Sequence, residues 1–168
     1  MKNEIDKKNE TRDYNYTACG LDNVIIGDMP YVLDDVGHEV IQIPMVNLLH
    51  AYIMLALVVK DCGLLACELK FLRTEMGLTQ AQLAERIRKD AQTIGRWERD
   101  EHPIDETAEV VIRLLILEHL EDISFLGEVE ENKPSYRIKT LSTKCVPSAS
   151  NDPIRIQAHG DAGYALVA

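Results

Sequence analysis

The sequence predicts a mainly α-helical protein with flanking β-structure, and three observations lead to this prediction. Apolar residues recur at helical spacing through most of residues 44–122. Short apolar runs bounded by turn residues lie before this region, in residues 23–43, and after it, in residues 154–166. Residues 69–99 carry seven basic and four acidic side chains, in a chain of 168 residues whose formal net charge is −10. We therefore expect five helices, a small N-terminal β meander and a C-terminal β-hairpin.

Length and composition allow one domain or two small ones, and 46% hydrophobic residues supply an ample core. Residues 1–12 are charged and do not resemble a signal peptide. The most apolar stretch, residues 41–59, is interrupted by polar residues and by Pro44, which is unlike a membrane span. We therefore expect a cytoplasmic protein that does not enter the membrane.

The N-terminal third predicts a meander of two or three strands followed by a helix. Residues 23–26 and 31–33 are short apolar runs separated by turn-forming residues, and residues 38–43 alternate weakly. Pro44 then opens a helix that continues to about Lys60, with apolar side chains on a wide stripe. Such a stripe is buried on more than one side, either in the core or against a partner.

Two further helices are predicted in the middle of the chain. Leu69–Met76 has helical spacing and stops at Gly77, a residue that tolerates the left-handed conformation of a helix end. Thr79 then follows as an N-cap with Gln82 three residues later, which is the spacing of a capping box. The second helix is short and its apolar stripe ends at Ile87.

Asp90 can cap another helix, Ala91–Arg99, in which Ile94 and Trp97 face inward. Two short helices across a turn of three or four residues form the geometry that lays the second helix in the major groove of DNA. The residues expected on the outer face of this second helix are Gln92, Thr93, Gly95, Arg96 and Arg99.

These residues carry a family resemblance. The segment LKFLRTEMGLTQAQLAERIRKDAQTIGRWERD, residues 69–100, resembles the helix-turn-helix of the XRE (Cro/CI-like) family. The motif Arg-x3-4-Gly-Leu-Thr-Gln-x2-Leu-Ala lies at Arg73–Ala84, and the Trp-Glu-basic ending lies at Trp97–Arg99. The resemblance extends over Leu69–Leu120 and implies a five-helix DNA-binding domain.

A second resemblance extends outward from this domain. Two segments, Cys-Gly-Leu-Asp-Asn-Val at Cys19–Val24 and the sequence of Asp90–Glu98, are similar to segments of bacterial MqsA-like antitoxin-type regulators. Such regulators often carry an N-terminal zinc module built from two Cys-x2-Cys pairs, and this chain keeps at most Cys19 of it. The resemblance implies a repressor that binds its own promoter and a toxin protein.

Two positions depart from the family pattern. Arg88 stands where the turn usually has glycine, and Asp100 stands where glycine usually ends the recognition helix. A left-handed conformation at either costs roughly 1 kcal/mol, and less for aspartate, whose side chain can bond locally. Gly95 lies inside the recognition helix at a similar cost and removes a possible base contact.

Seven residues are predicted to contact DNA. Gln92 can make a bidentate contact to adenine N6 and N7, and Arg96 can reach a guanine or a phosphate. Thr93 can contact the backbone or a thymine methyl group. The resemblance implies that Gln80 clamps a phosphate at a helix N-terminus. Lys89 and Arg99 are candidates for phosphate contacts. The predicted DNA-binding residues are Gln80, Lys89, Ala91, Gln92, Thr93, Arg96 and Arg99.

The sequence contains no motif for catalysis or for binding a metal or a cofactor. The five histidines lie in five different segments, with no nucleophile or phosphate loop at motif spacing. Cys19, Cys62, Cys67 and Cys145 include no Cys-x2-Cys pair, so we expect ordinary thiols in a reducing compartment. We therefore expect neither an enzyme nor a bound metal or cofactor.

The C-terminal part contains a last helix, an acidic segment and a hairpin. The helix, Ile104–Asp122, is apolar around most of its circumference, so a homodimer partner or the β segments must cover its second face. The acidic residues of 118–131 form a solvated face or a docking surface for a basic partner. After this acidic segment the pattern changes, with spaced apolar residues at Tyr136, Ile138 and Leu141. Residues 154–166 alternate around a glycine-rich turn, and this hairpin can pair with the N-terminal meander.

Four segments are thus expected. Residues 1–43 form a tail and a small β unit, and residues 44–64 a connecting helix. Residues 65–127 form the helix-turn-helix domain, and residues 128–168 a linker and hairpin.

Three functions are compatible with these observations. The first is a dimeric repressor of double-stranded DNA that is also the antitoxin of a toxin-antitoxin pair. The second is a stand-alone or phage-derived regulator whose flanking parts sense a ligand or form the dimer. The third is an interaction module whose helix-turn-helix has lost DNA binding.

Overall fold

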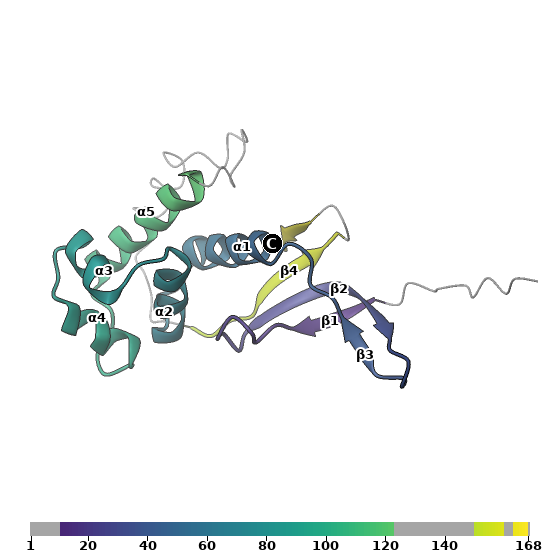
Figure 1. Cartoon of the computed structure of the whole chain (residues 1–168). Coiled ribbons are helices and arrows are strands. Elements are labelled where there is room, and N and C mark those ends of the chain that lie inside the picture. Colours follow the sequence, from purple (N-terminus) through teal and green to yellow (C-terminus); the bar gives the residue numbers. More distant parts are fainter. Residues whose placement is uncertain (1–10, 123–149, 160–162, 168) are drawn as a thin grey trace, which may run out of the picture.

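The computed structural model describes residues 11–122, 150–159 and 163–167 (Figure 1). It is mainly helical with flanking strands, as predicted. The predicted acidic positions 128–131 and the apolar pattern of residues 136–141 lie outside the described residues. The described helices are α1 (Val46–Val59), α2 (Ala66–Glu75), α3 (Gln80–Arg86), α4 (Ala91–Glu98) and α5 (Glu106–Asp122). The described strands are β1 (Thr11–Asn15), β2 (Val24–Leu33), β3 (Glu39–Ile41), β4 (Ile154–Ala158) and β5 (Tyr164–Leu166).

Strands from both ends of the chain form one sheet, in the order β1-β2-β4-β5, with β3 also paired to β2. The parallel pairing of β2 with β4 places Val24 beside Ile154. Strands β4 and β5 form the predicted antiparallel hairpin. The expected pairing of this hairpin with the N-terminal β unit is therefore confirmed.

The N-terminal strands differ from the prediction in two ways. Residues 23–26 and 31–33 are not separate strands, because β2 runs through both. The predicted turn is instead a local distortion within this strand. Asp28 has φ of +54°, and the register with β1 shifts between Arg12 and Tyr14. Strand β1 is the second difference. Its sequence, TRDYN, lacks the alternation of apolar and polar residues that predicts a strand, and most of its residues are exposed in the structure. Backbone pairing with β2 makes it a strand.

Helix α1 lies between the sheet and the helix-turn-helix (Figure 1). Leu49, Ile53 and Leu57 are fully buried, and α1 contacts α2, α5, β4 and β5. The prediction that its apolar stripe is buried on more than one side is confirmed. None of the helices in the described residues is long and apolar enough to cross a membrane.

A buried arginine ties the end of α1 to α5. Arg113, 1% exposed, donates to Glu109 Oε1 at 2.7 Å and to the carbonyl oxygens of Val58, Lys60 and Cys62 at 2.7, 3.0 and 2.6 Å. The guanidinium therefore neutralises the buried carboxylate and satisfies the free carbonyl groups at the C-terminus of α1. This network fixes the chain reversal between α1 and α2.

A histidine ties the N-terminal loop to α2. Tyr16 Oη lies 2.9 Å from His50 Nε2, and His50 Nδ1 lies 3.0 Å from a carboxylate oxygen of Glu75. Phe71 packs edge-on against the imidazole with ring centroids 5.7 Å apart. The N-terminal loop, α1 and α2 are thus held together by polar contacts as well as by the core.

Helix α5 begins at Glu106, two residues later than predicted, because the Asp105 carboxylate accepts a hydrogen bond from the Ala108 N–H at 2.8 Å. Ile112 and Ile116 are fully buried. Four further apolar residues are only half-buried, namely Val110, Val111, Leu114 and Leu115, of which Val111 and Leu115 pack against the core. The expected homodimer contact on this helix stays a prediction.

Candidate nucleic-acid interface

Local caps define the three helices of the site as predicted. Gly77, with φ of +68°, follows the end of α2. Thr79 Oγ1 accepts from the Gln82 N–H at 3.2 Å, and the Gln82 side chain accepts from the Thr79 N–H at 2.8 Å. The Asp90 carboxylate accepts from the Thr93 N–H at 2.8 Å and opens α4. The capping box and the second N-cap are therefore confirmed.

Left-handed residues end both α3 and α4, at the two positions where the sequence lacks the usual glycine. Arg88 and Asp100 each have φ of +58°. The Lys89 N–H donates to Ala84 O at 2.9 Å, and the Glu101 N–H donates to Arg96 O at 3.0 Å. These bonds close Schellman motifs, so the chain adopts the helix ends despite a cost of about 1 kcal/mol at each.

The outer face of α4 presents three of the predicted contact residues to solvent. Ala91, Gln92 and Arg96 are exposed, while Ile94 and Trp97 lie in the core with 0% and 5% exposure. The side chains that can reach base edges therefore lie on the face opposite the one that anchors the helix. This is the arrangement that a recognition helix requires.

Thr93 is half-buried, and its hydroxyl is engaged in the cap. Its Oγ1 donates to the second Asp90 oxygen at 2.9 Å. The paired hydrogen bonds from Thr93 lower the pKa of the Asp90 carboxyl, the backbone N–H first and the hydroxyl second. The hydroxyl of Thr93 thus orients the helix start, and only its methyl group is left to meet a base.

The prediction that Gly95 faces outward is wrong, because Gly95 is buried. A Cβ at this position would lie 3.0 Å from Nη1 of Arg99 and 3.3 Å from Oε1 of Gln80. These two side chains converge on α4 and cover the glycine. Gly95 therefore provides the space in which two of the predicted phosphate contacts meet.

Glu98 joins α2, α3 and α4. Its side chain is 4% exposed and accepts from Arg73 Nε and Nη2 at 2.5 and 3.0 Å and from Gln80 Nε2 at 2.8 Å. Arg73 also donates to Leu78 O at 2.7 Å. Arg73 and Glu98 are not among the predicted contact residues, although both lie in the motifs that carry the family resemblance. They orient Gln80 and fix the angle between the helices.

Two of the predicted phosphate-contacting cations pair with carboxylates at the surface. Arg99 donates to both oxygens of Glu101 at 2.5 and 3.1 Å, and this pairing lowers the pKa of Glu101. Lys89 Nζ lies 3.8 Å from an oxygen of Asp105. Solvent screens such exposed pairs, so a DNA phosphate can replace either carboxylate. Arg86 and Arg88 are also exposed, although they are not among the predicted DNA contacts. Their position in the basic segment 86–89 is the only sequence feature that could have indicated them as contacts.

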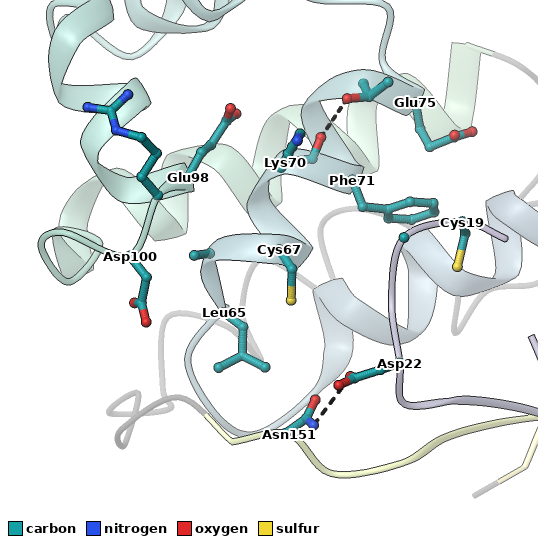
Figure 2. A pocket seen from close by; sticks show the side chains of 14 residues that line it. Cys19, Asp22, Leu65, Cys67, Lys70, Phe71, Glu75, Glu98, Asp100 and Asn151 are labelled. Atoms are coloured by element: carbon teal, nitrogen blue, oxygen red, sulfur yellow. Dashed lines mark hydrogen bonds between the residues drawn. The ribbon is translucent and has the colours of Figure 1, made fainter. Parts of the chain in front are cut away.

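A cavity of about 790 Å³ adjoins the C-terminal end of α4. Figure 2 shows its lining from α2, from the loop of residues 17–22 and from the turn after α4, with the thiols of Cys19 and Cys67 along it. Cys19 is half-buried and Cys67 is exposed, and partial desolvation raises the pKa of both thiols. No group of three metal-ligating side chains occurs among the residues that the structure describes.

A family model described as helix-turn-helix matches residues 69–115, which run from α2 into α5. No curated protein and no solved structure matches the chain. The matched residues contain the three caps, the two left-handed turns and the exposed face of α4. Sequence match and geometry agree that residues 69–115 form a helix-turn-helix domain, and this domain suggests a DNA-binding regulator.

Proposed function

We propose that this protein is a sequence-specific repressor that binds double-stranded DNA through α4 and acts as the antitoxin of a toxin-antitoxin pair. The observation that carries the DNA-binding part is the exposed face of α4 on a helix-turn-helix whose helices are joined by Glu98. The antitoxin role is supported by the resemblance of the outer segments to MqsA-like regulators. The protein would repress its own operon.

In the proposed complex the N-terminal half of α4 enters the major groove. Gln92 pairs with adenine, and Arg96, one turn later, reaches a guanine or a phosphate. Thr93 places its methyl group beside a thymine methyl. Lys89 and Arg99 exchange their carboxylate partners for phosphates on either side of the groove.

Gln80 contributes to phosphate binding mainly through its backbone. Its side-chain amide already donates to Glu98 at 2.8 Å, whereas its main-chain N–H lies at the first position of α3, where no intrahelical acceptor exists. A phosphate at this helix N-terminus would accept that N–H. The side chain then acts to hold the end of α3 against α4.

A homodimer would allow two copies of α4 to read half-sites about one helical turn, roughly 34 Å, apart. The half-buried apolar residues of α5 support this proposal, since a second copy would cover them. They are Val110, Val111, Leu114 and Leu115.

A stand-alone regulator with a ligand-sensing region is the alternative function. The cavity beside α4 favours it, because a molecule bound there would contact Arg99, a predicted phosphate contact, and Glu98, which holds the Gln80 side chain. Such a regulator would lack a toxin partner. Its DNA binding would change when the cavity is filled.

The experiment is a titration of the purified protein with its own upstream DNA and with an unrelated duplex of equal length, each at two salt concentrations. We expect tight, selective and salt-sensitive binding. Arg99→Ala should weaken binding to both duplexes and lower the salt slope by about 1. The matched control is Arg155→Ala, which removes another exposed arginine paired with a carboxylate, on β4. Equal affinity of the parent for both duplexes would refute sequence-specific autoregulation, and no binding at low salt would refute DNA binding altogether.

A further inference from the structure

The hairpin formed by β2 and β3 exposes apolar side chains on both of its faces. Residues 32–40 are all exposed, and the four large apolar residues among them are Val32, Leu33, Val36 and Val40, at 55, 63, 79 and 44%. Val32 and Val40 are direct cross-strand partners, so they share one face, while Leu33 lies on the other. Contiguous apolar exposure of this kind marks an interaction surface.

The outer edge of β3 has unused backbone groups. The Asp34 N–H donates to His38 O at 2.8 Å, and the register pairs Val32 with Val40 and Leu33 with Glu39. Hydrogen-bonded and non-hydrogen-bonded pairs alternate along an antiparallel ladder, so the N–H and C=O groups of Glu39 point away from β2. Within the described residues, β2 is the only strand paired with β3. This edge can therefore accept another strand.

The outer part of the hairpin, residues 32–40, is exposed and keeps its shape through its own hydrogen bonds, while Ile41 at its base packs against the core. Oδ1 of Asp34 accepts from the N–H groups of Val36 and His38 at 2.9 and 2.7 Å, and Gly37 has φ of +88°. The result is a three-residue loop with a left-handed glycine. A two-stranded ribbon that is exposed on both faces is marginally stable in water, so an added strand would stabilise it.

Charge indicates the kind of molecule that would bind here. Residues 28–41 contain four acidic side chains and neither lysine nor arginine, and the nearby Arg12 pairs with Glu39 and lies over the ring of Tyr31. An acidic surface repels DNA phosphates and also a second copy of itself. The hairpin projects from the end of the molecule opposite α3 and α4 (Figure 1), so a molecule bound to it would leave the DNA-binding face free.

We propose that the β2–β3 hairpin is the docking site for a basic protein, which adds a strand to the free edge of β3. Apolar side chains of the added strand pack beside Val32 and Val40, and its lysines or arginines meet Asp34, Asp35 and Glu39. Main-chain hydrogen bonds to Glu39 supply affinity, and the alternation of apolar and basic side chains supplies specificity. The biological meaning of this site rests on the proposed antitoxin function, whose toxin would be the basic partner.

The test uses a synthetic peptide of about six residues that alternates valine and lysine, which is the length of a typical strand. Fluorescence anisotropy measures its binding to the full chain. Two further peptides serve as controls: one has proline at alternate positions and the same charge, and the other has glutamate in place of lysine. We expect only the first peptide to bind, because proline cannot donate to the ladder and glutamate is repelled.

Variants of the protein locate the binding site. Val40→Lys should weaken peptide binding by about tenfold or more, since it adds a like charge beside the proposed strand. Val32→Lys tests the same face independently, and circular dichroism checks that both variants fold. The matched control is Val167→Lys, which changes a valine of 47% exposure after β5 and should leave peptide binding unchanged.

Several results would overturn the proposal. These are no binding of the valine-lysine peptide, equal binding of the proline peptide, or equal effects of the hairpin and control variants. A dimer of the parent that Val40→Lys dissociates in sedimentation would make a second copy the occupant instead. Upstream-DNA binding is measured in parallel and should be unaffected in every variant. If the parent protein does not bind DNA, the proposed function is refuted and the peptide result is unaffected. If the parent protein binds DNA but not the peptide, the docking site is refuted and the DNA-binding function is unaffected.

Discussion

Replacing Gly95 by alanine should stabilise the protein and weaken its DNA binding. Gly95 lies inside α4 with an ordinary helical backbone, where glycine costs about 1 kcal/mol relative to alanine. The new Cβ would lie 3.0 Å from Nη1 of Arg99 and 3.3 Å from Oε1 of Gln80, which is closer than side chains normally allow. Both contacts are with the ends of side chains, so these ends can move away and the backbone need not.

The two effects differ in size and sign. If Arg99 and Gln80 move freely, the free energy of unfolding rises by up to about 1 kcal/mol, which raises Tm by about 2–4 °C for a chain of this length. The same movement takes the Arg99 guanidinium away from its place over α4. Because a phosphate contact is independent of sequence, affinity should fall about equally for the upstream and the unrelated duplex.

Thermal unfolding and the DNA titration measure the two effects on one sample. Gly77→Ala is the matched control, because Gly77 has open space around it but φ of +68°, so the same methyl group should destabilise by about 1 kcal/mol. A fall in Tm for Gly95→Ala would mean that the covering side chains cannot move. Unchanged DNA affinity would contradict the assignment of the Arg99 side chain to phosphate binding.

Three further predictions concern recognition, stability and pH. Gln92→Ala should cost about 1–3 kcal/mol at the cognate site and relax sequence choice at one position, as read from competition with single-base variants of the site. Arg113→Met should lower the free energy of unfolding, measured by urea denaturation, by about 3–5 kcal/mol, because it leaves Glu109 charged and buried. In the double variant with Glu109→Gln, the free energy of unfolding should fall by less than the sum of the two single losses. The pKa of Asp90 is lowered in the folded protein, so its stabilising effect is complete above its ordinary pKa of 3.8 and is lost as pH falls through the folded value. Asp90→Asn keeps the cap and should make acid unfolding less steep, and an unchanged slope would count against this role.

Much of the DNA-binding domain could be predicted from the sequence because its information is local. Thr79, Gln82 and Asp90 satisfy N–H groups no more than three residues away, so their spacing alone indicates where helices begin. The inward positions of Ile94 and Trp97 follow from helical periodicity in the same way.

Long-range contacts could not be predicted in this way. Glu98 and Gly95 have their roles only because Arg73 and Gln80 arrive from other helices, and in sequence Gly95 resembles an exposed helical position. Strand β1 lacks any apolar alternation and exists because β2 offers it a backbone ladder. The free edge of β3 is likewise a property of the sheet.

Local periodicity and capping therefore specified the helices of the helix-turn-helix, the caps that begin α3 and α4, and the exposed face of α4. Tertiary packing decided which side chains cover Gly95, how the two ends of the chain combine in one sheet, and that an acidic hairpin projects away from α4. The physical reason is the range of the interactions. A cap or an apolar stripe is complete within a few residues of sequence, whereas a buried ion pair or a strand pairing depends on residues that only the folded chain brings together.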